Sequence, residues 1–521
     1  MKHSCTALMA VCHMPVLVAL GHCAYAQPSI EWQRALGGAN VEEAFDIEQT
    51  PDGGFIIAAT AASSDGDVVG NQGGDDAWVV KLDGAGMIEW QRSLGGSGFE
   101  EAQSIDLTDD GGYIVAGWTS SVDGDVTDLN GGADLWLVRL DATGQLIWQK
   151  CLGGSGVDEA TAVITTSDGG FVVVGKTLSN DGDVSGYHGG GGDFWVVKTN
   201  GQGDLLWQRT LGGSDYDVPA SVLEDSAGDL IVVGRTHSDD GDVTVAHGDA
   251  DLWVVRLSAS GTLIAQRTLG GSSYDDARSI AASIDGGFTL AGTTLSDDGD
   301  VVGSHGSAGD LWVVRLDDAF DLLWQKVLGG TNSDFGGTVL PRSNNGWVIL
   351  ATTSSDDHDV TMTMGSFDYW LVELDATGDL QWQRTLGGQG SDWGLSVTAT
   401  TDGGFACAGW IKSFDGDVTG FHGGRDAWIV KLHSGATGIE QPIIPGIRVR
   451  RDGHSDQLHV STDRPLSSGS LEVYDGRGRL WQQWSVKGQH HTLWVGDLAP
   501  GTYFITIRTE IGVFAEKYMH D

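Results

Sequence analysis

Residues 32–38 read Trp-Gln-Arg-Ala-Leu-Gly-Gly, and this pattern returns along the chain at intervals of 58 or 59 residues. Its first position falls at Trp32, Trp90, Trp148, Trp207, Ala265, Trp324 and Trp382. A second series keeps step with the first, at Trp78, Trp136, Trp195, Trp253, Trp312, Trp370 and Trp428. Two series that share one period along most of the chain indicate an internal repeat, and the repeat decides the fold.

Each unit contains four short runs rich in β-branched and aromatic residues, which indicate strands. In the first unit we expect them at 44–50, 54–60, 77–82 and 87–94. Asp52-Gly53-Gly54 separates the first two runs, and glycine there suits the positive φ of a tight hairpin. No unit shows a convincing helical period, so the chain is predicted to be all-β.

Four antiparallel strands repeated seven times predict a seven-bladed β-propeller with blades of 58–59 residues. A solenoid is the alternative, but a solenoid needs polar end caps. The array begins with an isolated outer-strand sequence at 30–36, and it ends at 428–432 with a third strand and no fourth. The N-terminal strand therefore completes the last blade and closes the ring, which removes both exposed edges.

Composition excludes several classes of protein. Glycine supplies 80 of 521 residues and proline only 9, which excludes collagen, and 40 % hydrophobic residues with 20 tryptophans exclude a disordered chain. The formal charge of −43 disfavours binding to nucleic acid or to an anionic membrane surface. No later run is apolar enough for a transmembrane segment. We also expect the protein to be a monomer.

Residues 1–26 have a basic start, an apolar stretch and a small-x-small end, which predict a secretory signal peptide. A lipoprotein signal acylated at Cys23 is disfavoured by the bulky His22 before it. Of the two cysteines outside this segment, Cys151 and Cys407 lie far apart in sequence, and we expect them to be buried and unpaired rather than bridged.

Acidic residues recur at four positions of every unit, all in loops expected on one face of the propeller. The first position, a candidate ligand face, holds Glu42, Glu100, Asp158, Asp217, Asp275, Asp334 and Asp392. The second and third flank a glycine in the pairs Asp65 and Asp67, Asp123 and Asp125, Asp181 and Asp183, Asp240 and Asp242, Asp298 and Asp300, and Asp415 and Asp417, with His358 replacing the glycine between Asp357 and Asp359. The fourth holds Asp76, Asp134, Asp193, Asp251, Asp310, Asp368 and Asp426.

The Asp-Gly-Asp pairs offer hard carboxylate oxygens on a tight turn, which suits calcium in a secreted protein. The alternative is that these aspartates cap their own backbone amides, since no unit carries a full calcium-loop signature. Histidine recurs in the same loop of four units, at His188, His247, His305 and His422. A zinc site is disfavoured there because three units carry Gln72, Asn130 or Met364 instead.

Catalysis is disfavoured because the acids are equivalent in every unit, whereas an active site needs a unique group. No Gly-x-Ser-x-Gly or His-Glu-x-x-His motif is present. The recurring tryptophans are expected in the core. Four others break the repeat and are candidates for a ligand surface: Trp118, Trp347, Trp393 and Trp410.

The repeat ends before residues 435–445, which we expect to form a linker, and the balance of charged residues changes after them. Residues 446–521 hold nine Lys/Arg and nine Asp/Glu, and their alternating runs predict a small β-sandwich. Tyr-Asp-Gly-Arg-Gly-Arg at 474–479, followed by Leu-Ala-Pro-Gly-Thr-Tyr at 498–503, resembles the C-terminal sorting domain of type IX secretion cargo. The motif residues are Tyr474, Asp475, Gly478, Arg479, Leu498, Gly501 and Tyr503. The Pro-Asn-Pro opening of that family is absent.

This resemblance implies export through the periplasm to the outer cell surface or the medium, with the type IX machinery as a partner. The propeller repeats, residues 27–434, also resemble Gly/Asp-rich repeats of secreted bacterial proteins. The sequence therefore predicts a secreted propeller that serves as a non-catalytic binding, adhesion or structural module for a glycan or protein ligand. The alternative is a carbohydrate-active hydrolase or lyase that uses acidic residues of the propeller face.

Overall fold

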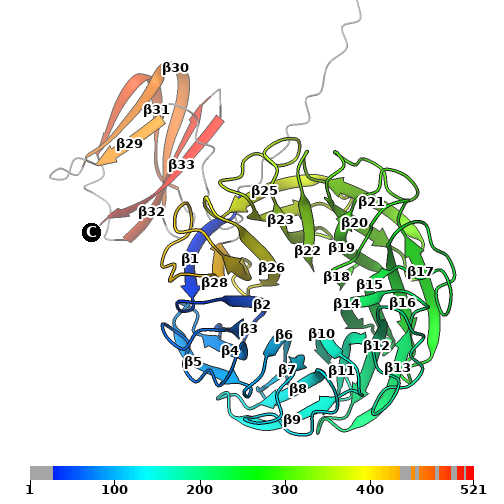
Figure 1. Ribbon diagram of the computed structural model, residues 1–521. Coiled ribbons are helices and arrows are strands. Elements are labelled where there is room, and N and C mark those ends of the chain that lie inside the picture. Colours follow the sequence, from blue (N-terminus) through cyan, green and yellow to red (C-terminus); the bar gives the residue numbers. More distant parts are fainter. Residues whose placement is uncertain are drawn as a thin grey trace, which may run out of the picture.

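The computed structural model describes residues 27–433 and five shorter segments, 447–451, 457–475, 480–494, 501–509 and 512–520. The expected signal peptide, 1–26, and the expected linker, 435–445, lie outside the described residues. Residues 29–433 form seven four-stranded antiparallel sheets arranged as blades around a central axis (Figure 1). The predicted seven-bladed propeller is confirmed.

The first three blades each use four consecutive strands. Blade 1 contains β2 (Glu42–Gln49), β3 (Phe55–Ala61), β4 (Asp76–Leu82) and β5 (Ile88–Leu94). Blade 2 contains β6 (Glu100–Leu107), β7 (Tyr113–Thr119), β8 (Asp134–Leu140) and β9 (Leu146–Leu152). Blade 3 contains β10 (Asp158–Thr165), β11 (Phe171–Thr177), β12 (Asp193–Thr199) and β13 (Leu205–Leu211). The strands of the first unit match those expected to within two residues.

The next three blades repeat this order, and the seventh departs from it. Blade 4 contains β14 (Asp217–Glu224), β15 (Leu230–Thr236), β16 (Asp251–Leu257) and β17 (Leu263–Leu269). Blade 5 contains β18 (Ser279–Ala282), β19 (Phe288–Thr294), β20 (Asp310–Leu316) and β21 (Leu322–Leu328). Blade 6 contains β22 (Asp334–Pro341), β23 (Trp347–Thr353), β24 (Asp368–Leu374) and β25 (Leu380–Leu386). Blade 7 contains β26 (Asp392–Ala399), β27 (Phe405–Ile411), β28 (Asp426–His433) and β1 (Ser29–Leu36).

The ring closes through β1, the first strand of the chain. It pairs antiparallel with β28, so the sheet order of blade 7 is β1-β28-β27-β26. Figure 1 shows β1 in dark blue at the outer edge of this blade, beside the yellow strands of the end of the array. The expected closure by an N-terminal outer strand is confirmed.

The two tryptophan series keep step because each blade couples them by a hydrogen bond. The third-strand tryptophan is at most 2 % exposed in all seven blades. Its indole Nε1 donates to the glutamine that follows the first-series position, as Trp78 does to Gln91 at 2.7 Å. The same bond joins Trp428 of β28 to Gln33 of β1, also at 2.7 Å. A buried indole N–H needs an acceptor, and the Trp-Gln motif supplies it.

The first-series tryptophans pack between blades. Trp32 meets Phe55 of blade 1 edge to face, with ring centroids 5.6 Å apart, and donates to the carbonyl oxygen of Gly84 at 3.1 Å. Gly86, with φ of 76°, lies against this indole, where a Cβ atom would approach within 2.7 Å of the ring. The glycine-rich hairpin between the last two strands of a blade thus receives the tryptophan of the preceding outer strand.

The C-terminal region contains β29 (Ile447–Arg451), β30 (Gln457–Asp475), β31 (Leu480–Trp494), β32 (Gly501–Thr509) and β33 (Gly512–His520). They form one hydrogen-bonded sheet in the order β29-β30-β32-β33, with β31 paired to β30. The predicted sandwich of two sheets is not confirmed. Across the described residues of the chain, no helix has the length and apolar character needed to cross a bilayer.

Candidate ligand-binding face

The seven acids that follow the Gly-Gly pairs lie inside the protein rather than at its surface. Each is 0 % exposed, and in six blades it begins the first strand. In blade 3, Asp158 Oδ2 accepts from the amide of Gly154 at 2.8 Å and from Ser179 Oγ at 2.7 Å, while Oδ1 accepts from Thr177 Oγ1. The set expected at a ligand face therefore joins the inter-blade loop to the Ser-x-Asp-Gly-Asp loop. Its members are Glu42, Glu100, Asp158, Asp217, Asp275, Asp334 and Asp392.

The Asp-Gly-Asp pairs lie in the same loops, and their two members point to different partners. Asp181 Oδ1 accepts from the amide of Ser155 at 2.7 Å, and this backbone hydrogen bond lowers the pKa of Asp181. Asp183 Oδ2 faces the amide of Gly153 at 3.3 Å. The glycine between them, Gly182, has φ of 63°. These contacts match the backbone-capping alternative for the first aspartate of each pair.

The other loops repeat this division between the two aspartates of a pair. The first aspartate accepts from the amide two residues after the first glycine of Leu-Gly-Gly, at 2.6–2.9 Å, in Asp65, Asp123, Asp181, Asp240, Asp298 and Asp415. The second aspartate faces the amide of that first glycine at 3.2–3.5 Å, in Asp67, Asp125, Asp183, Asp300 and Asp417. The blade 6 loop follows the same pattern with Asp357 and Asp359. In the blade 4 loop, Asp242 lies 3.7 Å from His188 Nε2. The first carboxylate of each pair thus caps the inter-blade loop, and calcium binding by the pairs stays a prediction.

The repeat-breaking tryptophans separate into three environments. Trp347 is 2 % exposed and packs edge to face on Trp324, with ring centroids 5.3 Å apart, so it belongs to the core rather than to the ligand surface expected for it. Trp118 is half-buried in blade 2, where its Nε1 donates to Glu101 at 3.1 Å. Trp393 and Trp410 are cross-strand partners on β26 and β27 of blade 7.

Trp393 and Trp410 belong to a row of half-buried aromatic rings on blades 6 and 7. Phe335 stacks on Trp393 with centroids 5.3 Å apart and planes 19° apart, and Trp393 stacks on Trp410 at 5.8 Å and 15°. Phe367 closes the row against Trp393 at 5.0 Å. Because Phe335 and Trp393 come directly after the buried acids Asp334 and Asp392, the row lies at the strand ends that carry the acidic loops. We call Phe335, Phe367, Trp393 and Trp410 the aromatic row.

Two cations extend the aromatic row. The guanidinium of Arg425 lies 4.0 Å from the centroid of Trp410, and Lys412 Nζ lies 5.9 Å from it. Arg425 also forms an ion pair with Glu43 of blade 1. The result is a surface of stacked rings that ends in positive charge, on a protein whose net charge is −43.

Sequence reasoning missed Phe335, Phe367 and Arg425 of this surface. A signal was present, because the position after the first acid changes character around the ring. It is acidic in blades 1–3 and aromatic in blades 6 and 7: Glu43, Glu101, Glu159, Val218, Asp276, Phe335 and Trp393. Aligning the units by their acids therefore separates one part of the face from the rest.

A cavity of about 550 Å³ runs along the axis, lined by the first strands of all seven blades. Asp46 of β2 contributes to its wall, where its carboxylate accepts from Ser104 Oγ at 3.2 Å and from Ser396 Oγ at 2.9 Å. Glu48 lies two residues further on. Burial, together with the nearby charges of Asp46 and Asp106, raises the pKa of Glu48 to about 8. Sequence reasoning also missed these carboxyl groups, which the other blades do not repeat as a set.

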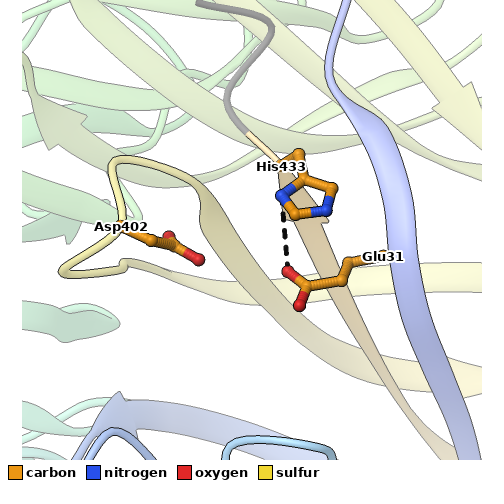
Figure 2. Close-up of side chains that lie close together, drawn as sticks. All are labelled: Glu31, Asp402 and His433. Atoms are coloured by element: carbon orange, nitrogen blue, oxygen red, sulfur yellow. Dashed lines mark ion pairs between the residues drawn. The ribbon is translucent and has the colours of Figure 1, made fainter. Parts of the chain in front are cut away.

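One further cluster brings together Glu31, Asp402 and His433, whose ligating atoms lie within 4.8 Å of one another (Figure 2). All three are exposed, and His433 Nδ1 lies 3.5 Å from Glu31. Lys431 Nζ reaches both acids, at 3.3 Å from Glu31 and 2.7 Å from Asp402. An ammonium group thus already neutralises the pair, and the cluster joins β1 to the rest of blade 7.

The histidines of the acidic loops contact the recurring aspartates. His188 Nδ1 lies 2.8 Å from Asp193, and His422 Nδ1 lies 2.9 Å from Asp426.

Cys151 and Cys407 are both buried and free, as expected from the sequence.

The described part of the C-terminal motif lies on adjacent strands. Tyr474 and Asp475 end β30 and pair with Phe504 and Tyr503 of β32, the strand that Gly501 begins. Gly478, Arg479 and Leu498 lie outside the described residues.

Comparison with known proteins supports the C-terminal reading. Residues 454–520 match the family of the secretion system C-terminal sorting domain. The regulatory protein FlaEY of Caulobacter vibrioides is 25 % identical over 395 residues, which cover 67 % of this chain and 40 % of that relative.

Similar solved structures include puromycin hydrolase, an ulvan lyase of a polysaccharide lyase family, and the WD40 domain of Neurospora crassa Pan2. Their TM-scores are 0.44, 0.42 and 0.40, and their identities 11 %, 10 % and 12 %. The match to puromycin hydrolase covers 89 % of this chain and 58 % of the hydrolase chain. The match to the ulvan lyase covers 73 % of this chain and 93 % of the lyase chain. The match to the Pan2 domain covers 76 % of this chain and 89 % of that domain's chain. Likenesses at this level carry no argument about activity. The fold and the sorting domain together establish that the chain is a β-propeller cargo protein of type IX secretion, exported to the cell surface or the medium.

Proposed function

We propose that this secreted propeller is a non-catalytic binding module of the cell exterior, and that its ligand surface is the aromatic row with Arg425 and Lys412. The observation that carries the proposal is the contrast within one face. The acids that follow the Gly-Gly pairs are buried in hydrogen bonds to the protein's own loops, whereas the aromatic row is partly open and occurs on two blades alone.

The chemistry of the aromatic row favours a polysaccharide. Sugar rings present apolar C–H groups that pack on indole and phenyl rings, and the partly exposed parts of the aromatic row offer such contacts along one surface. Arg425 at the end of the row suits a carboxylate or sulfate substituent of the polysaccharide. Ligand classes of this kind also fit a protein delivered to the outside of the cell.

The axial cavity supports a second candidate, a carbohydrate-active hydrolase or lyase. Glu48, with a pKa raised to about 8, holds a proton at neutral pH beside the carboxyl groups of Asp46 and Asp106. A protonated carboxyl group beside a second carboxyl group is the pattern of general-acid catalysis on glycosidic bonds. Two features weigh against this candidate: Asp46 is engaged by the hydroxyl groups of both neighbouring blades, and Glu48 accepts from Thr398 Oγ1 at 3.2 Å.

A screen against neutral, carboxylated and sulfated polysaccharides tests both candidates. Replacing Trp393 and Trp410 by alanine should reduce binding at least tenfold, since stacking surfaces are lost together. Trp118→Ala is the matched control, because Trp118 holds the equivalent place in blade 2 and should leave affinity unchanged. Chain cleavage by the intact protein that is abolished by Glu48→Gln would instead establish the hydrolase or lyase.

A further inference from the structure

Three carboxylates from two neighbouring blades converge on the first glycine of each Leu-Gly-Gly. Between blades 1 and 2 they are Asp76, Glu100 and Asp125, around Gly95. A Cβ atom on Gly95 would lie 2.4 Å from Glu100 Oε2 and 3.0 Å from Asp76 Oδ1, and the Gly95 amide faces Asp125 Oδ2 at 3.3 Å. Every blade interface repeats the convergence of the two strand-end acids, around Gly37, Gly95, Gly153, Gly212, Gly270, Gly329 and Gly387.

One oxygen of each group has no hydrogen-bond partner. Asp76 Oδ2 accepts from the amide of Gln72 at 2.7 Å, but Oδ1 is buried without a hydrogen bond. The same atom lacks a hydrogen bond in all seven blades, in residues that are at most 1 % exposed: Asp76, Asp134, Asp193, Asp251, Asp310, Asp368 and Asp426. In two of them an imidazole Nδ1 lies near this oxygen, His247 at 3.6 Å from Asp251 and His305 at 3.8 Å from Asp310. A buried carboxylate oxygen without a partner is costly, and a sevenfold recurrence marks a property of the repeat.

The cationic side chains of the blades lie mostly away from these acids. Lysine and arginine of the third strands pair at the opposite ends of the blades, as Lys81 does with Asp52 at 3.0 Å. At one interface, Arg209 lies 3.8 Å from Asp242. Four interfaces place an imidazole beside the acids, as His305 does 3.6 Å from Asp359. The other three hold an uncharged side chain at the position of the imidazole: Gln72, Asn130 and Met364.

We propose that each blade interface is a binding site for a hard cation, calcium, held directly by the unpartnered aspartate Oδ1 and the neighbouring strand-end acid. Calcium accepts six to eight oxygen ligands in variable geometry. Water molecules fill the remaining coordination positions, as they commonly do in calcium sites. The inference concerns the ring itself and is independent of the polysaccharide proposed above.

This site differs from the one expected from the Asp-Gly-Asp pairs. The first aspartate of a pair is occupied by a backbone amide, as Asp123 Oδ1 is by Ser97 at 2.7 Å. The second, such as Asp125, faces the glycine on which the other two acids converge. Asp125 Oδ2 also accepts from Gln72 Nε2 at 2.7 Å, so the direct ligands of the proposed site are the two acids outside the pair. A glycine at the centre keeps the space between the carboxylates free of a side chain.

Calorimetric titration of the full chain, freed of metal by chelator and held at pH 7.5, tests this proposal. We expect binding of seven calcium equivalents and a higher melting temperature, with magnesium as the comparison cation. The triple variant Asp76→Asn, Asp134→Asn and Asp368→Asn removes the unpartnered carboxylate from the interfaces without histidine, and it should bind four. Asp123→Asn is the matched control in the same loop as Asp125 and should still bind seven.

Two results would overturn the proposal. One is an unchanged melting temperature and no heat of binding when calcium is added to the unmodified chain, which would assign the buried oxygens to water or protons. The other is a triple variant that is folded by circular dichroism and still binds seven equivalents. Because the first result needs no variant, misfolding of the triple variant leaves the proposal open to refutation.

Discussion

Blade 7 and blade 1 have the same geometry but different connectivity. In blade 1 the outer strand β5 follows β4 through a short hairpin, whereas in blade 7 the outer strand β1 comes from the other end of the array. Even so, Ala35 lies opposite Trp428 as Ser93 lies opposite Trp78. The arrangement of a blade is therefore fixed by its side chains and hydrogen bonds, and the hairpin is dispensable for it.

Pairing of the outer strand costs more conformational entropy in blade 7 than in blade 1, because no short loop joins β1 to β28. Its two partner strands must meet across nearly the whole array, whereas those of blade 1 are separated by five residues, from Asp83 to Met87. The cluster of Glu31, Asp402, Lys431 and His433 adds ion pairs to this junction. The comparison predicts that matched substitutions in blades 1 and 7 destabilise the protein equally. It also predicts that loss of β1 has a larger effect than any of these substitutions.

Deletion of residues 27–37 is expected to have the largest effect. It removes β1, exposes the edge of β28 and uncovers Trp428 and its neighbours, so the protein should aggregate or unfold at a much lower temperature. Size-exclusion chromatography and thermal unfolding measure this. A soluble monomer with an unchanged unfolding midpoint would show that the ring does not need its closing strand.

Trp428→Ala and Trp78→Ala should each destabilise the propeller by about 3–5 kcal/mol, because both indoles are fully buried. Denaturant unfolding of the two variants measures the free energy of each. If the contacts of the closing blade are as complete as those of blade 1, the two losses agree. A clearly smaller loss for Trp428 would mean that the junction with β1 is already loose in the intact protein.

Gln33→Ala and Gln91→Ala remove the acceptor and leave the indole N–H of Trp428 or Trp78 unsatisfied. Each variant should lose roughly 1–3 kcal/mol, the cost of a buried donor without a partner. The pair sharpens the comparison because each glutamine also donates one hydrogen bond, Gln33 to Thr419 Oγ1 and Gln91 to the carbonyl oxygen of Val69, so the two variants lose matching contacts. Equal unfolding free energies support equivalent blades, and a difference above about 1 kcal/mol contradicts it.

The smallest effect concerns acid. Partial burial acts to raise the pKa values of Asp402 and Asp52. Hydrogen bonds and the charges of Lys431 and Lys81 outweigh this effect and lower both pKa values to about 2. A lowered pKa contributes stability above the ordinary value of 3.8, and this contribution is lost as the pH falls towards 2. Asp402→Asn and Asp52→Asn should therefore each weaken the decline in melting temperature between pH 4 and pH 2. Both carboxylates are largely exposed, so the change is small. A steeper decline in either variant contradicts the assignment.

The sequence predicted the blades because the repeat supplies its own alignment, and it predicted ring closure because 30–36 is an outer strand without a blade of its own. The sequence analysis wrongly assigned Trp347 to a ligand surface because a tryptophan there is unusual among the repeats. The position of the residue in its strand, however, follows the repeat. Other blades begin the same strand with Phe55, Tyr113 or Phe171, so a large core ring is the rule there.

The acids were harder to place than the tryptophans. Whether a loop aspartate meets solvent or its own backbone depends on how two loops from one blade fold onto each other. Asp158, at 0 % exposure, and Asp181, at the surface, are both polar loop-end residues in sequence. The aromatic row escaped prediction for a related reason, since Phe335 and Trp393 become neighbours through the ring rather than along the chain.

The pairing of β1 with β28 also sets the order of events during biogenesis. A chain that enters a compartment with its amino end first presents residues 29–36 long before residues 426–433 arrive. Until then the first strand has no partner, and the ring stays an open arc with two reactive edges. Ring closure therefore waits for the segment just ahead of the sorting domain, and it is the last step in assembly of the propeller.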